Sequence, residues 1–136
     1  MVRLIMSESG TGKTKQLIEQ INSAARDESG SVVCIEASSA LTYNVDHHVR
    51  LVSADEYQVT SYEILRGFIS GLYAGNYDIS HVFIDNLFKI VHGCCDLETE
   101  TFLHWLSGFS NDHGVKFTIS ISEDPANATD GMQKYL

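Results

Sequence analysis

The most constraining feature of this sequence is a short polar loop between two apolar segments near its start. The apolar run Val2–Met6 is typical of a buried strand. After the loop, Leu17, Ile18 and Ile21 recur at the spacing of an amphipathic helix that begins at Lys13. The chain therefore opens with a strand–turn–helix unit, which is typical of α/β folds.

The loop between them reads Ser7-Glu8-Ser9-Gly10-Thr11-Gly12-Lys13-Thr14. It matches the Walker A pattern, Gly-x-x-x-x-Gly-Lys-Ser/Thr, at every defined position except the first. Because Gly12 has no Cβ, the backbone can curl so that successive amides point inward. These amides lie at the N-terminus of the following helix, the positive end of its dipole. The sequence therefore predicts a site for the phosphates of ATP. Its residues are Ser9, Gly10, Thr11, Gly12, Lys13 and Thr14.

Two members of the loop have more specific predicted roles. Lys13 is expected to reach the β- and γ-phosphates as a catalytic residue, and the Thr14 hydroxyl to bind Mg²⁺. Ser7 replaces the first glycine of the pattern. If that position needs a backbone angle reserved for glycine, the serine strains the loop by about 1–3 kcal/mol. If the backbone there is extended, the serine costs little.

Strand-like and helix-like segments alternate along the rest of the chain. This alternation predicts an α/β fold with a mainly parallel sheet and helices on both faces, in three layers, as a single domain over residues 1–136. The sequence suggests a capping box with Thr60 as N-cap and Glu63 as its partner. Residues 37–58 and the polar tail after Ser122 carry no readable motif. The expected strands are Val2–Met6, Ser31–Glu36, Val49–Ser53, Ile79–Asp85 and Val115–Ile121, and the expected helices run from Lys13 to about Asp27, from Thr60 to about Gly75, over Leu87–Val91 and from about Glu98 to Phe109.

Two carboxylates follow predicted strands. The run Val82-Phe83-Ile84-Asp85 resembles a Walker B strand, in which the terminal acid binds Mg²⁺. Ligands of open α/β sheets gather at the carboxyl ends of the strands, where Asp85 and the loop would both lie. Glu36 ends the strand after the first helix, so it is expected at the same edge.

These motifs give the chain a resemblance to P-loop NTPases with a RecA-like core, which include thymidine kinases. GTPases are disfavoured because Asp85-Asn86-Leu87-Phe88 lacks their glycine and no Asn-Lys-x-Asp motif is present. No arginine follows Arg66 that would serve in a kinase lid, and no Leu-Ser-Gly-Gly-Gln signature of ABC ATPases occurs. The resemblance implies that Glu36 is the catalytic glutamate that orients the attacking water. It also makes Ser120 and Ser122 candidates to sense the γ-phosphate.

Charge and composition limit the partners. The formal net charge of −9 disfavours nucleic acid, whose binding rests on Lys and Arg. No apolar run is long enough for a membrane span, and no signal peptide is visible, so we expect a cytoplasmic protein with no membrane partner. Cys34 is expected in the core, and Cys94 and Cys95 as free thiols. His47, His48 and Arg50 are interpreted as solvated loop residues, with an arginine finger for a neighbouring subunit as the alternative.

The leading hypothesis is a protein that binds ATP and Mg²⁺ and hydrolyses ATP slowly, together with a protein partner or as a homo-oligomer. Whether the chain is an enzyme stays open at this point. A second hypothesis is a switch or adaptor that holds nucleotide without hydrolysis, which the Ser7 replacement and the Asn86 after Asp85 motivate. A third is a small-molecule kinase that acts on nucleosides; the absence of a zinc ribbon and of a visible nucleoside lasso weakens this one.

Overall fold

The computed structural model describes residues 1–8, 13–38 and 44–136, and of Lys13 only its backbone. These residues form one five-stranded sheet, with strand order β1-β5-β4-β2-β3 and parallel pairing throughout. The α/β fold with a parallel sheet is therefore confirmed. The strands are β1 (Val2–Ser7), β2 (Ser31–Glu36), β3 (Arg50–Ser53), β4 (Ile79–Asp85) and β5 (Lys116–Ser122), and the helices are α1 (Lys13–Asp27), α2 (Tyr62–Gly75), α3 (Leu87–Val91), α4 (Leu97–His113) and α5 (Asp130–Gln133), with 3₁₀ turns at Asp55–Tyr57 and Pro125–Asn127.

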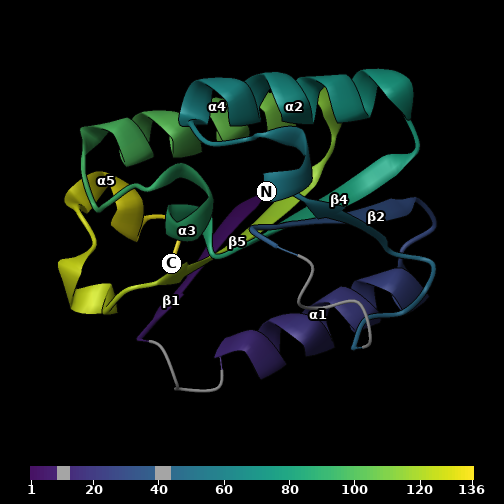
Figure 1. The fold of residues 1–136 in the computed structure, drawn as a ribbon, viewed down its shortest axis with the longest axis horizontal. Coiled ribbons are helices and arrows are strands. Elements are labelled where there is room, and N and C mark those ends of the chain that lie inside the picture. Colours follow the sequence, from purple (N-terminus) through teal and green to yellow (C-terminus); the bar gives the residue numbers. More distant parts are fainter. Residues whose placement is uncertain (9–12, 39–43) are drawn as a thin grey trace.

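Helices cover both faces of the sheet and give it three layers. Figure 1 shows α1 on one side, and α2 and α4 together on the other. Leu17 and Ile21 of α1 are fully buried against Val32, Cys34 and Phe83 of the sheet. The opposite face carries the larger core, which α2, α3, α4 and α5 complete. The predicted arrangement of helices on both faces is thus confirmed.

The boundaries of two helices differ from the sequence prediction. The N-cap of α2 is Ser61, whose hydroxyl accepts a hydrogen bond from the Ile64 amide, so the predicted capping role of Thr60 is wrong by one residue. Helix α4 runs to His113, beyond the predicted end at Phe109, and stops at Gly114 in the left-handed conformation. A glycine adopts that conformation without the steric cost of a Cβ, and this ends the helix.

The tail after β5, which the sequence left without a motif, is part of the core. Met132 of α5 is fully buried and Tyr135 almost so. The carbonyl oxygen of Tyr135 accepts a hydrogen bond of 2.8 Å from the Leu4 amide of β1. The tail therefore covers the outer edge of β1, whose backbone groups would otherwise be open to solvent on that side. No helix among the described residues is long and apolar enough to span a membrane.

Candidate functional site

The predicted site residues gather at the carboxyl edge of the sheet. Because all pairs are parallel, β1, β2, β4 and β5 end at the same edge. Glu36 and Asp85, the last residues of β2 and β4, are direct register partners. Ser7, the last residue of β1, is likewise paired with Ser122 of β5. Helix α1 begins at this edge too, five residues after Glu8, so both ends of the predicted phosphate loop are anchored there.

The two carboxylates also share one face of the sheet. Side chains alternate along a strand, so Glu36 faces the same side as Cys34, and Asp85 the same side as Phe83. Cys34 and Phe83 both pack against α1. Burial, together with the nearby carboxylates of Asp85 and Glu36, raises the pKa of the Cys34 thiol far above its ordinary value. Both acids therefore lie on the α1 face, and Cys34 remains a neutral core thiol, as predicted.

The environments of the two acids differ. Glu36 is buried, with 2% of its surface exposed, whereas Asp85 is half-buried. Adjacent strands lie about 4.8 Å apart, and like charges directly opposite each other in a sheet destabilise it. A cation at this edge would relieve that repulsion, and carboxylate oxygens are the ligands that Mg²⁺ prefers. The donor set therefore fits Mg²⁺.

Ser120 has a role that the sequence prediction did not assign. It is fully buried on β5, and its hydroxyl donates to Asp85 Oδ1 over 3.0 Å. Ser120 Oγ in turn accepts a hydrogen bond of 2.8 Å from the Asn86 amide. The hydroxyl proton is used by Asp85, so Ser120 holds the acid in place. These contacts give Ser120 a positioning role toward Asp85, and its contact with a γ-phosphate stays a prediction.

The residue after Asp85 supports this arrangement. Asn86 has φ 58° and ψ 67°, a left-handed conformation that asparagine adopts more readily than most residues. This backbone turn aims the Asn86 amide at Ser120 and ends β4 directly after Asp85. Asn86 also precedes α3, whose Leu87 and Ile90 are buried. The apolar segment after Asp85 therefore packs inward.

Ser7 resolves the question left open by the missing first glycine. It belongs to β1 and is not among the described residues with positive φ, so the backbone there is extended and the serine imposes no strain. Its Oγ is buried and has no hydrogen-bond partner among the described residues. Buried hydroxyl groups without a partner are rare, and a bound polar ligand is one common explanation.

The remaining predicted residues are placed only in part. Thr14 lies exposed in the first turn of α1, at the end where the helix dipole favours anions. The predicted contributions of Ser9, Gly10, Thr11, Gly12 and the Lys13 side chain fall outside the described residues. Ser122 is half-buried at the end of β5, beside Ser7.

Comparison with solved structures identifies the kind of fold. The crystal structure of the flagellar accessory protein FlaH from Methanocaldococcus jannaschii superposes with a TM-score of 0.59 and 9% sequence identity. The match covers 98% of this chain and 65% of that chain. The two proteins share a three-layer α/β fold. At this identity the likeness concerns the fold alone. No family model and no curated protein matches the sequence.

A cavity of about 710 Å³ lies at the opposite edge of the sheet. Ser31 and Ile79, the first residues of β2 and β4, both line it. The carboxylates and the start of α1 are at the other ends of these strands, so this cavity is separate from the candidate nucleotide site. The candidate nucleotide site is the carboxyl edge, where Glu36, Asp85 and the start of α1 lie together.

Proposed function

We propose that residues 1–136 form a single P-loop domain that binds ATP with Mg²⁺ and hydrolyses it slowly, with a protein partner or as a homo-oligomer. The observation that carries this proposal is the meeting of three features at one edge of the sheet. These are the two ends of the Walker A-like loop, the start of α1, and the paired acids Glu36 and Asp85. The three-layer α/β fold is consistent with this function.

In the proposed complex, the amides of residues 9–14 and the Lys13 ammonium hold the phosphates at the start of α1. Thr14 and Asp85 hold the Mg²⁺ ion, and Ser120 fixes Asp85 by its hydrogen bond to Oδ1. When bound, Mg²⁺ neutralises charge on the phosphate oxygens. The Ser7 hydroxyl, buried at the entrance to the loop, donates to the same group of anionic oxygens.

Glu36 is the proposed general base. A carboxylate next to the γ-phosphate accepts a proton from the attacking water and aligns it for in-line attack. Glu36 lies on the strand next to Asp85 and on the same face of the sheet. In the proposed complex it is therefore beside the metal ion and is not one of the ligands of that ion.

One observation favours a second candidate function, a switch that holds nucleotide without hydrolysis. The same burial of Glu36, at 2% exposure, suits a carboxylate that organises the core as well as one that contacts water. The residue after Asp85 is Asn86, whose amide is occupied by Ser120. In that case Asp85 and the loop bind nucleotide while Glu36 has no part in chemistry.

The first experiment tests nucleotide binding. Isothermal titration with ATP and Mg²⁺ is performed on the wild type, on Lys13→Ala and on Lys15→Ala. Lys15 is an exposed lysine in the same turn of α1 and serves as the matched control. We expect binding that is lost in Lys13→Ala and retained in Lys15→Ala. Equal affinity in all three proteins, or no binding in any, would refute the proposal.

The second experiment separates the candidate functions. Phosphate release at saturating ATP is compared between the wild type and Glu36→Gln, which keeps the size of the side chain and removes its charge. Turnover that disappears in Glu36→Gln supports the ATPase. Background release in both proteins, with binding intact, supports the switch. Transfer of labelled phosphate to added nucleosides, in place of release to water, would identify the third hypothesis, a nucleoside kinase.

A further inference from the structure

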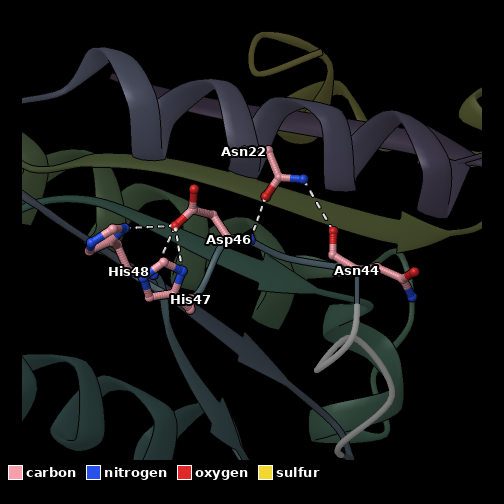
Figure 2. Close-up of polar contacts among 5 residues, drawn as sticks. All are labelled: Asn22, Asn44, Asp46, His47 and His48. Carbon is pink, nitrogen blue, oxygen red and sulfur yellow. Dashed lines mark hydrogen bonds and ion pairs between the residues drawn. The ribbon is translucent and has the colours of Figure 1, made fainter.

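A cluster of ligand-type side chains lies away from the nucleotide site, in the loop before β3. Asp46, His47 and His48 are consecutive and project from this loop beside α1 (Figure 2). Their candidate ligand atoms all lie within 4.8 Å of one another. The sequence interpretation treated both histidines as solvated loop residues. They are indeed exposed, but they converge on one carboxylate.

The contacts within the cluster centre on Asp46 Oδ1. His48 Nδ1 lies 3.0 Å from this oxygen, and His47 Nδ1 lies 3.9 Å from it. The two imidazole rings have their centroids 4.0 Å apart, at an interplanar angle of 37°. Bonds of about 2 Å from zinc to nitrogen and oxygen put neighbouring ligand atoms roughly 3–4 Å apart. The separations of 3.0 Å and 3.9 Å between the histidine nitrogens and Asp46 Oδ1 fall in this range.

The side chain of Asn22 on α1 forms two hydrogen bonds with the backbone of this loop. The Asn22 amide donates to the Asn44 carbonyl oxygen over 3.1 Å, and Asn22 Oδ1 accepts a hydrogen bond of 2.7 Å from the Asp46 amide (Figure 2). Asn22 thus holds the backbone that carries the Asp46 carboxylate in a fixed position relative to α1. A ligand set on a backbone held in this way loses less conformational entropy when it binds an ion.

The charge of the chain also suits a cation. The net charge of −9 on the chain attracts cations in general.

We propose that Asp46, His47 and His48 form a binding site for a divalent transition metal of the zinc class, with the remaining coordination position open to water. Two imidazole nitrogens and one carboxylate oxygen form the ligand set that zinc accepts, and one that Mg²⁺ and Ca²⁺ disfavour. When the ion binds His48 through Nδ1, the proton of that nitrogen moves to Nε2 through solvent, so the ring stays neutral and no net proton is released. This site is independent of the proposed nucleotide function.

The test is a titration of the full chain with Zn²⁺ in the absence of nucleotide and Mg²⁺. It uses a Cys94→Ser/Cys95→Ser background, because these thiols are free and not fully buried. Calorimetry measures affinity and stoichiometry, and imidazole nitrogen resonances in NMR spectra identify the ligands. We expect one equivalent of Zn²⁺ to shift the resonances of His47 and His48 and to leave those of His104 unchanged.

Three variants complete the test. His47→Ala/His48→Ala should weaken Zn²⁺ binding by more than tenfold, whereas His104→Ala, which removes an exposed histidine from α4, should not change it. Asn22→Ala should weaken binding by about 10–100-fold, as loss of a group that orients a metal ligand does. Circular dichroism checks that each variant is folded. The proposal is overturned if Zn²⁺ does not bind at one equivalent, or binds equally well without His47 and His48.

Discussion

Ser120→Ala is the most informative perturbation of the candidate site, because one hydroxyl connects Asp85 with the backbone that follows it. The variant removes two hydrogen bonds, of 3.0 Å to Asp85 Oδ1 and of 2.8 Å from the Asn86 amide. The neutral bond contributes about 1 kcal/mol and the bond to the carboxylate about 1.5 kcal/mol, at the low end since Asp85 is half-buried and regains water. The lost oxygen leaves almost no cavity. We therefore expect a destabilisation of roughly 2–3 kcal/mol.

The assay is urea unfolding followed by far-ultraviolet circular dichroism, combined with nucleotide titration. The matched control is Thr129→Val, which replaces a buried hydroxyl that has no partner among the described residues. This control should be neutral or slightly stabilising. Ser120→Ala should in addition weaken ATP binding in the presence of Mg²⁺ more than in its absence. A variant within about 0.5 kcal/mol of the wild type, close to the effect of an ordinary surface substitution, would refute the positioning role.

Three further predictions concern the scaffold. Burial, partly offset by Glu28, lowers the pKa of His81 below 6.5, so the unfolded chain binds more protons and stability falls as the pH drops below about 6.5. Urea unfolding at several pH values should show a smaller dependence in His81→Asn, and an unchanged one would contradict the assignment. Gly30→Ala should destabilise, since its Cβ would lie 2.5 Å from a backbone carbonyl oxygen, whereas Gly71→Ala, on an open face of α2, should stabilise by about 1 kcal/mol in thermal melts. Met132→Ala should cost about 2–5 kcal/mol in the same urea assay, and a negligible effect would show that the tail is not part of the core.

The strands were predictable to within one residue because each is a short apolar run bounded by polar residues. The helix ends were less predictable. Ser110 to Asp112 have the composition of a turn, yet they continue α4, whose end is set by the backbone of Gly114. The tail was missed because its buried apolar residues, Ala128, Met132 and Tyr135, are too few within a polar segment to predict a packed element. Nor does the sequence encode, in any local pattern, that β5 lies between β1 and β4.

The acids of the candidate site could be predicted because their positions depend on local rules. Glu36 and Asp85 end parallel strands, and such ends meet at one edge. Ser120 depends on tertiary contacts instead, whereas Asp46, His47 and His48 are neighbours in the sequence and only their link to Asn22 requires the fold. One signal for Ser120 was available: Lys116, Thr118, Ser120 and Ser122 alternate with apolar residues along β5. Polar alternation usually marks a solvent-facing side, but Thr118 and Ser120 are buried, so their hydroxyls need partners within the protein.

This polar side of β5 connects two clusters on the α1 face of the sheet. Thr118 bonds to the ring of His81 over 2.8 Å, and the other ring nitrogen lies 2.7 Å from Glu28, just after the end of α1. Two residues further along the strand, Ser120 holds Asp85. Asp85 is therefore oriented by a buried side chain of the sheet. Because Asp85 is preorganised in this way, we expect Ser120→Ala to reduce only the part of the nucleotide affinity that depends on Mg²⁺. Lys13→Ala, in contrast, should abolish nucleotide binding with or without Mg²⁺.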